Sequence, residues 1–588
     1  MLTNSLIAGA LAAAYVVVLI LHLNPTLPIT WAAIAPLVVR VGVFYAAYLA
    51  AIAYALLIIR QLLGRNVFSP AWISVNVIAW SGCVAATAGA SVMWANVATF
   101  GLVLETKTIE ALSASAFVVA AVALLLFVIA IGQRRRTGRR VWAAAVALLV
   151  AASVVIPTAL RWRATLPPVE AGMSGAALEM PPPLRGYDSR TAGGGDGAPH
   201  VTVIALDAGS LEVITNATSE GRLPNFGRIL DAGAITHLAT LHPTSAEAVW
   251  AAIATGKFPQ KNGVRSGAVY QLAGRPGDDP IRLLPDYCFA TGLLRFGVLT
   301  QEPLTSEALR ASTLWTILSA AGLSVGVVNF PLTYPAPSVR GFVVSDAYLR
   351  LSAPPTGLHD SSSLYPPSLE PEAAAVLQSV DQGALLPAAL RELAERHRVP
   401  ARTDRIYERL HQALTTAHPV QVSLLRFQSP DPIGHYFLRY AMPSRFGDVT
   451  DEERRRYGGM LEAHYAIVDE AIGRAIAELA PDDLLLVVSG YGMEPLSVEK
   501  RLLEQVIGDP EISGSHEAAP DGFLMAYGAS VARARQLRRA AIVDVLPTIL
   551  YFLGLPVARD MDGYARPDLF RTAFTEERPI TFIPTYDR

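Results

Sequence analysis

An acidic residue and two histidines provide the clearest chemistry in this sequence. Asp431 and His435 stand four residues apart in Asp431-Pro-Ile-Gly-His435, so on a helix they share one face. His516 of Gly514-Ser-His516 would complete three protein ligands with a fourth position open, which is the arrangement of a catalytic zinc. Two simpler interpretations stay open, because Asp431 before a proline could begin a helix and Gly-Ser-His could be a turn. We favour the metal site.

These residues, and a second acid, follow apolar segments that are typical of strands. Asp207 ends His200-Val-Thr-Val-Ile-Ala-Leu-Asp207, Asp431 comes shortly after 420–427, and Ser489-Gly-Tyr-Gly492 follows 484–489. Ligands of parallel α/β sheets bind beyond the carboxyl ends of the strands. We therefore expect these three turns to meet at one site.

The C-terminal part of the chain alternates between strand and helix patterns. Strands are predicted at 201–206, 324–330, 341–345, 420–427 and 484–489, and helices at 245–254, 309–321, 384–397, 403–416, 458–479 and 539–553. Short, nearly all-apolar strands separated by helices indicate a mostly parallel central sheet covered on both faces. The predicted fold class is an α/β/α sandwich.

The N-terminal part is different, because it consists of long apolar stretches. The chain has 588 residues, of which 52% are hydrophobic. Stretches long enough to cross a bilayer lie near 3–23, 38–59, 72–103, 112–132 and 141–160. We predict a transmembrane domain of five helices over residues 1–163, which makes the chain a multi-pass membrane protein.

Loop charge predicts the orientation of these helices. The loop Gln133-Arg-Arg-Arg-Thr-Gly-Arg-Arg140 is strongly basic and should stay in the cytoplasm, and alternation places Arg60 and Arg65 there too. The N-terminus is then cytoplasmic, and everything after residue 163 is extracytoplasmic, periplasmic if the membrane is an inner membrane. The net charge of −2 gives no reason to expect a nucleic-acid partner.

Composition also separates the remaining segments. Residues 164–199 are rich in Pro, Gly, Ser and Ala and have no helical or strand period, so we predict a linker there. The α/β domain should occupy 200–572, followed by a C-terminal tail at 573–588.

Several motifs, in their order along the chain, resemble the alkaline phosphatase superfamily. The segments that carry the resemblance are Asp207 with Pro224-Asn-Phe226, Val325-Gly-Val-Val-Asn-Phe-Pro331, Asp431-Pro-Ile-Gly-His435, Tyr465 to Asp469, Gly514-Ser-His516 and Asp560-Met-Asp-Gly563. They look like the type I phosphodiesterase/nucleotide pyrophosphatase branch. The resemblance implies an alkaline-phosphatase-like fold, with cap-type insertions at about 257–323 and 346–418.

The resemblance also implies two metal sites, of which this sequence retains one. One family metal would take Asp431, His435 and His516. The other would take Asp207, a nucleophile hydroxyl and an adjacent Asp-His pair, but here the nucleophile position is Ala246 and the pair reads Gly490-Tyr491. Glycine has no ligand atom and phenol is a poor zinc ligand, so we expect one zinc or similar divalent cation at most, with Asp207 as a weak further candidate.

Ser245 is the nearest hydroxyl that could replace the missing nucleophile. A shift of one residue on a helix turns a side chain by about 100°, so Ser245 would need a local rearrangement. A structural interpretation competes with it, since Thr244-Ser-Ala-Glu247 has the spacing of a capping box.

Two classes of function remain open at this point. The chain could be a family member with a degenerate site and weak or no activity, kept as a binding subunit of a membrane complex. Alternatively, it could be an active single-metal phosphodiesterase or phosphotransferase acting on a lipid- or nucleotide-linked phosphate. In both cases the membrane is a partner, and a phosphate-ester or lipid-linked ligand is expected if the chain is active.

Overall fold

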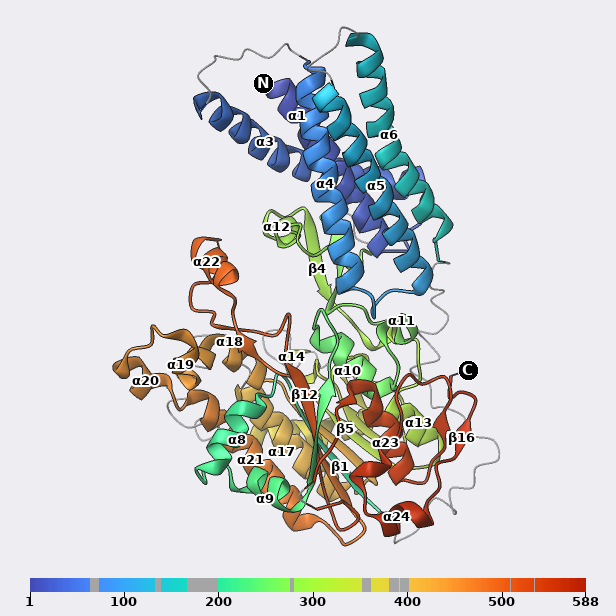
Figure 1. The fold of residues 1–588 in the computed structure, drawn as a ribbon. Coiled ribbons are helices and arrows are strands. Elements are labelled where there is room, and N and C mark those ends of the chain that lie inside the picture. The colour runs from blue at the N-terminus through green and yellow to red at the C-terminus, as the bar shows by residue number, and fades with distance from the viewer. Residues whose placement is uncertain are drawn as a thin grey trace. The chain divides into compact units, whose positions relative to one another are not determined.

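The chain divides into two compact units, each described by itself. The computed structural model describes residues 1–63, 73–132, 139–166, 199–274, 280–351, 361–379, 391, 401–507, 509–533 and 535–587. The first unit, here called the membrane unit, comprises 1–170 together with 265–303. The second, the sheet unit, comprises 171–264 and 304–588. Figure 1 shows the elements of both by label.

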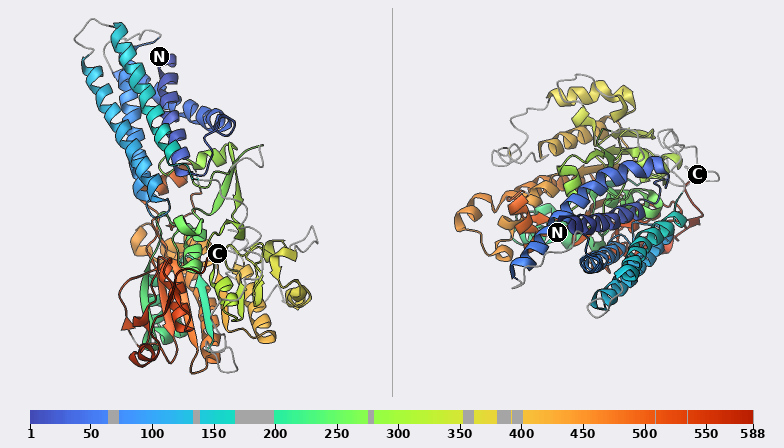
Figure 2. Two further views of the ribbon diagram at one scale, coloured as in Figure 1. Left: turned by 90° about the vertical axis from the view of Figure 1, so that its right-hand side faces the viewer. Right: turned by 90° about the horizontal axis from the view of Figure 1, so that it is seen from above.

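Long apolar helices form the membrane unit. They are α1 (Leu2–Leu23), α2 (Trp31–Leu37) continuing through a π-helical turn (Val38–Gly42) into α3 (Val43–Leu63), α4 (Val75–Thr99), α5 (Thr106–Gly132) and α6 (Arg139–Arg163). Within the described residues, five spans are long and apolar enough to cross a membrane. α1 packs on α3 and α4, and α5 packs on α4 and α6 (Figures 1 and 2). This agrees with the predicted number of helices and supports a membrane-associated protein.

A later segment of the chain packs with these helices. Residues 265–303 contain a hairpin of β3 (Ala268–Leu272) and β4 (Leu299–Pro303) and the short helix α12 (Thr291–Arg295). Asn24, at the end of α1, donates a hydrogen bond to the Leu283 carbonyl (2.8 Å) and accepts one from the Leu283 amide (3.0 Å). Asn96 of α4 does the same with the carbonyl and amide of Asp286, at 3.1 and 3.0 Å. Most of the insertion predicted at 257–323 therefore belongs to the membrane unit.

The sheet unit is built on a mostly parallel sheet of ten strands, in the order β13-β2-β12-β9-β1-β8-β5-β6-β7, with β14 also paired to β2. Its main strands are β1 (Val201–Leu206), β2 (Ala234–Ala239), β5 (Val325–Val328), β6 (Gly341–Val344), β8 (Val422–Phe427), β9 (Leu484–Tyr491) and β12 (Asp521–Tyr527). The shorter strands are β7 (Leu364–Tyr365), β13 (Arg535–Gln536) and β14 (Ala540–Ala541). β12 is antiparallel to both of its neighbours, and β7 is antiparallel to β6.

Helices cover this sheet in two groups. One consists of α8 (Leu211–Ser219), α9 (Pro224–Ala232), α18 (Pro430–Ala441) and α21 (Met460–Glu478), which pack on one another. The other contains α10 (Ala246–Thr255) and α23 (Val545–Phe552), also in mutual contact, and α13 (Leu314–Ala320). The two groups lie on opposite sides of the strands in Figure 1. The expected α/β/α sandwich is confirmed.

The central strands bring the predicted turns together. β1 runs parallel to both β8 and β9, with Leu206 opposite Phe427 and Ser489. The segments after Leu206, Phe427 and Ser489 therefore leave the sheet at the same edge, as expected for parallel strands. This edge carries the site described below.

All five predicted strands of the α/β domain are present, but the sequence analysis missed β2 and β12. Among the predicted helices, 384–397 falls almost wholly outside the described residues. The predicted linker at 164–199 also lies mostly outside them, as does part of the insertion at 346–418. The predicted tail contains the end of α24 (Thr572–Glu577) and β16 (Phe582–Ile583), which pairs with β15 (Val557–Ala558).

Candidate functional site

Asp431, His435 and His516 form a compact cluster of metal-ligand atoms. Asp431 and His435 lie in the first turns of α18, which begins at Pro430, and His516 follows the short strand β11 (Gly514–Ser515). One donor atom from each residue lies within 4.8 Å of the others. The Asp431 Oδ1 atom is 3.7 Å from His435 Nε2 and 3.5 Å from His516 Nε2. Tetrahedral zinc ligands about 2.0 Å from the metal lie roughly 3.3 Å apart, so the three donors fit a zinc-like ion.

The hydrogen bonds around the cluster leave its donors available. His435 Nδ1 is 2.7 Å from the Gly514 carbonyl, so this nitrogen carries the proton and Nε2 presents its lone pair. Asp431 Oδ1 and His516 Nδ1 are buried without a hydrogen-bond partner. A buried polar atom without a partner is costly unless something else satisfies it. The three side chains are 21–27% exposed, whereas the Asp431 Oδ1 atom between the two histidines is itself buried.

Asp207 has different partners, namely an arginine and a tryptophan. Its carboxylate accepts a hydrogen bond from Trp250 Nε1 (2.6 Å) and one from Arg426 Nε (3.0 Å) on Oδ1, while a second Arg426 nitrogen binds Oδ2. Arg426 lies on β8, the strand beside β1, and Trp250 lies on α10. Two parallel N–H bonds to one carboxylate are the strongest form of ion pair. A guanidinium thus supplies the positive charge beside Asp207.

Burial and the neighbouring charges together shift the pKa values of the groups in this ion pair. Asp207 is 3% exposed, and burial raises the pKa of its carboxyl, while Arg426 and Trp250 oppose that rise. Burial alone would lower the pKa of Arg426, but Asp207 beside it raises that pKa, so the guanidinium stays charged. Burial also raises the pKa of Glu247, one turn before Trp250, and Arg426 again opposes the rise.

The start of α10 contains the position where the family resemblance places a nucleophile. Ala246 is the first residue of this helix, and its methyl group offers neither nucleophile nor ligand. Ser245 precedes it as the N-cap and donates to a carboxylate oxygen of Glu247 (3.1 Å). The Thr244 hydroxyl donates instead to the Leu241 carbonyl (2.8 Å). The capping-box interpretation is therefore wrong, because the hydroxyl of Thr244 turns back to the preceding loop.

Gly490 and Tyr491 end β9 on the same edge. A Cβ atom at Gly490 would come within 2.3 Å of Val249 and 3.0 Å of Ile253, both on α10. A larger side chain fits there only if the side chains of Val249 and Ile253 shift. Tyr491 is fully buried, its ring centroid is 5.2 Å from that of His516, and its hydroxyl has no hydrogen-bond partner. Burial raises its pKa well above the usual value, so its oxygen is a neutral phenol.

Two further motifs position this edge without contributing chemistry. The Asp469 carboxylate accepts the backbone amides of Asn225 (3.0 Å) and Phe226 (2.7 Å), and the Tyr465 hydroxyl accepts the amide of Ser210 (2.7 Å). These bonds fix the turn after β1 and the start of α9.

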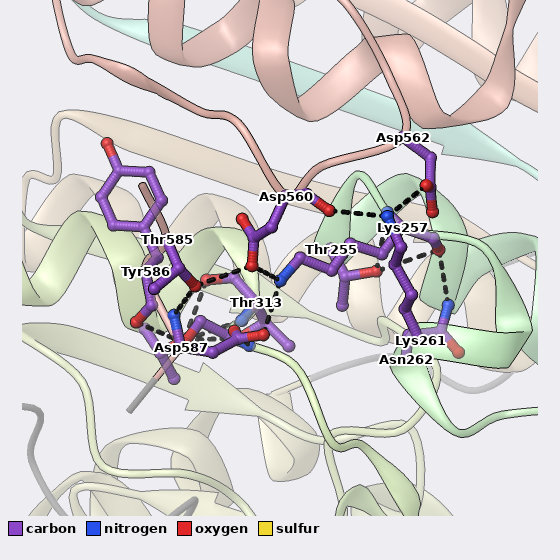
Figure 3. A network of polar contacts seen from close by, with 12 residues as sticks. Thr255, Lys257, Lys261, Asn262, Thr313, Asp560, Asp562, Thr585, Tyr586 and Asp587 are labelled. Carbon is purple, nitrogen blue, oxygen red and sulfur yellow. Dashed lines mark hydrogen bonds and ion pairs between the residues drawn. The ribbon is translucent and has the colours of Figure 1, made fainter. Parts of the chain in front are cut away.

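The closing segment fixes the far end of α10 in a similar way. Lys257, whose side chain is almost fully buried, pairs with Asp560 (2.7 Å) and Asp587 (2.5 Å), and Asp562 accepts the Phe258 amide (2.8 Å). Figure 3 shows these contacts, with Lys261 reaching Asp562 as well. The polar network therefore anchors the C-terminal residues of the chain and the end of the helix that begins with Ala246.

A family model decides the relationship of this chain to known proteins. The model described as type I phosphodiesterase/nucleotide pyrophosphatase matches residues 201–540, which is more than half of the chain. The chain belongs to this family. A search of curated proteins found no match.

Solved structures of one family enzyme are similar to this chain. They are murine ectonucleotide pyrophosphatase/phosphodiesterase 5 and an inactive variant of it in complex with AMP, at 13% and 12% identity. Each match covers 63% of this chain and 100% of the other, with a TM-score of 0.36.

Within this family member, sequence reasoning named the metal trio and the altered positions but missed Arg426 and Trp250. One signal was available. Val422-Ser-Leu-Leu-Arg-Phe427 is an apolar strand with an arginine near its carboxyl end, and a charge in the middle of a parallel sheet needs a buried partner. Asp207, at the end of the neighbouring strand, was the obvious acid.

Proposed function

We propose that this chain is a membrane-anchored family member with a degenerate active site. It would bind a phosphate ester beyond the carboxyl ends of β1, β8 and β9, with weak or no turnover by the family's two-metal mechanism. The observation that carries this proposal is the buried pair between Arg426 and Asp207. A carboxylate that already accepts two guanidinium N–H groups and an indole N–H has little capacity left for a metal ion.

The other altered positions support the same conclusion. Family catalysis relies on two metals that stabilise the attacking and leaving oxygens. At Ala246 there is no hydroxyl to attack, and Gly490 has no ligand atom, while a carboxylate there would require the side chains of Val249 and Ile253 to shift. The remaining cluster of Asp431, His435 and His516 is suited to one zinc or similar divalent cation, which would supply Lewis-acid character to a bound phosphate oxygen.

A second candidate function is an active single-metal phosphodiesterase or phosphotransferase on a lipid- or nucleotide-linked phosphate. The partial exposure of the metal trio favours it, because a catalytic metal needs a free coordination position. Ser245 would then be a displaced nucleophile. Its hydroxyl donates to Glu247, which is the type of partner an activated serine requires, although burial raises the pKa of Glu247.

We further propose that the sheet unit is extracytoplasmic, that is, periplasmic if this is an inner membrane, and that the N-terminus is cytoplasmic. The basic loop at 133–140 supports this orientation. A reporter fused after residue 200 should be active only outside, and one inserted at 133–140 only in the cytoplasm. A cytoplasmic signal from the first fusion would reverse the proposed orientation.

Metal content and hydrolysis, measured on the purified full-length chain, test the functional proposal. We expect one zinc-like ion per chain or none, loss of that ion in His516→Ala, and very slow hydrolysis of a generic phosphodiester. His418→Ala is the matched control, because this surface histidine pairs with Glu372 outside the site.

Three outcomes of these measurements distinguish the degenerate site from an active single-metal enzyme. Two stoichiometric ions per chain would contradict the proposed degenerate site. Robust hydrolysis that disappears in Ser245→Ala would establish a displaced nucleophile. Hydrolysis that survives Ser245→Ala but not His516→Ala would instead favour a metal-activated water.

A further inference from the structure

The membrane unit contains a cavity that the phosphodiesterase fold does not explain. Its volume is about 300 Å³, and it lies between α1, α3, α4 and residues 287–289. Aromatic and small side chains line it, among them Tyr15, Tyr45, Tyr48, Ala88, Gly89 and Phe289. All of these belong to the same compact unit.

Two features show that the cavity is a built part of the helix bundle. Gly89 lies against the ring of Tyr15, where an added Cβ atom would come within 2.8 Å, so only glycine lets α4 approach α1 this closely. Tyr45 is 1% exposed, and its hydroxyl has no hydrogen-bond partner. A buried hydroxyl without a partner is costly within a bilayer, where no water replaces the missing bond.

The segment that closes one side of the cavity has an unusual backbone. Tyr287 and Phe289 have φ angles of 62° and 52°, in the left-handed region that bulky residues rarely adopt. The Phe289 ring stacks on Tyr48, with centroids 5.8 Å apart. Asn24 and Asn96 hold the preceding residues in place through the hydrogen bonds described above. Strain of this kind persists where surrounding contacts impose it, and it concentrates at binding sites.

From this geometry we infer that the cavity binds one hydrocarbon chain of a membrane lipid, which packs against the exposed rings of Tyr48 and Tyr287. The surrounding helices are the candidate membrane spans, so lipid is the available occupant. Tyr48 and Tyr287 are 43% and 68% exposed, which leaves a side through which a chain can enter. An engineered apolar cavity of about 150 Å³ holds benzene, so twice that volume holds on the order of a dozen carbon atoms.

Aromatic packing provides the affinity of this site. Lipid tails are as apolar as the cavity wall, so moving a chain from the bilayer into the cavity gains little from the hydrophobic effect. The gain comes from contact with the tyrosine and phenylalanine rings that line the cavity.

Filling the cavity tests the inference. Ala12→Leu and Ala88→Leu each place three more carbon atoms in the cavity lining, whereas Ala120→Leu adds the same atoms on an exposed face of α5. After purification of the full chain in mild detergent, the amount of bound lipid per chain is measured by mass spectrometry. We expect a fall of at least fivefold in the double variant Ala12→Leu/Ala88→Leu and no change in Ala120→Leu.

A second measurement covers the case in which the filled variant misfolds. Wild-type protein in vesicles that contain a phospholipid with a photoreactive group midway along one acyl chain should be labelled on α1, α3 or α4 at the lining residues. Labelling spread evenly over the exposed helix faces, or equal lipid content in the filled and control variants, would overturn the inference.

Discussion

Replacing Arg426 with methionine should destabilise the sheet unit in a way that depends on pH. The substitution keeps the length of the side chain but removes both N–H bonds to Asp207 and leaves only the bond from Trp250. Removing one partner of a buried ion pair costs about 3–5 kcal/mol, because the other charge remains buried alone.

The loss of stability in this variant has an upper limit, which is set by the free energy of protonating Asp207. An unpaired buried Asp207 can escape the penalty by taking up a proton, and the ordinary pKa of its carboxyl is 3.8. Protonation costs about 1.36 kcal/mol per unit between that pKa and the solution pH, so the loss is limited to about 4 kcal/mol at pH 7 and about 2 kcal/mol at pH 5. For a unit of roughly 370 residues, 4 kcal/mol lowers the melting temperature by about 5 °C.

Chemical denaturation of the full chain in detergent, followed by tryptophan fluorescence at both pH values, measures these losses. The double variant Asp207→Asn/Arg426→Met should recover most of the stability, since it removes the buried charge together with its partner. A loss below 1 kcal/mol at pH 7, or an equal loss at pH 5 and pH 7, would refute the view that Arg426 neutralises a buried carboxylate.

Three further predictions follow from other contacts. Ala246→Ser should add no phosphodiesterase activity in a hydrolysis assay, because Arg426 still forms its ion pair with Asp207. A more than tenfold rise in the hydrolysis rate would contradict this. Lys257→Met should leave Asp560 and Asp587 without their shared cation and loosen the C-terminal residues, so limited proteolysis should cut near residue 580 faster than in the exposed control Lys500→Met. Burial raises the pKa of Asp404 to about 7, so the folded state holds an extra proton between about pH 4 and pH 7, and stability from this group falls as pH rises through that window. Relative to Asp404→Asn, the wild type should therefore lose up to about 4 kcal/mol from pH 4 to pH 7, and parallel stability curves would disprove the shift.

Much of the fold was predictable because its central strands are nearly continuous apolar runs. β1, β8 and β9 are buried almost completely on both faces, so Val, Leu and Ile make up most of their residues. β2 was missed because Ala234-Ile-Thr-His-Leu-Ala239 alternates buried and partly exposed residues near the edge of the sheet. β12 was missed because Asp521-Gly-Phe-Leu-Met-Ala-Tyr527 lacks β-branched residues.

The candidate site was predictable only where spacing along the chain carried information. Asp431 and His435 are one helical turn apart, so the sequence itself places them together. Arg426 and Trp250 come from two different elements, and their meeting at Asp207 depends on the strand order β9-β1-β8 and on how α10 packs on β9. The arginine in the apolar strand β8 signals that a buried acid is nearby, but the strand order is needed to identify that acid as Asp207. The packing of residues 265–303 with the membrane helices is hidden for the same reason, since it rests on two asparagines far away in the sequence.

The half of the site around Asp207 depends on several elements together, and no single substitution would convert it into a metal site. A carboxylate at residue 490 collides with the side chains of Val249 and Ile253 unless these side chains shift. The helix that carries them, α10, is held by the hydrogen bond from Trp250 to Asp207 and by Lys257 near its end. Even with both side chains repacked, Arg426 would remain bound to Asp207. A second metal would therefore require substitutions on β8, β9 and α10 together, beginning with the replacement of Arg426.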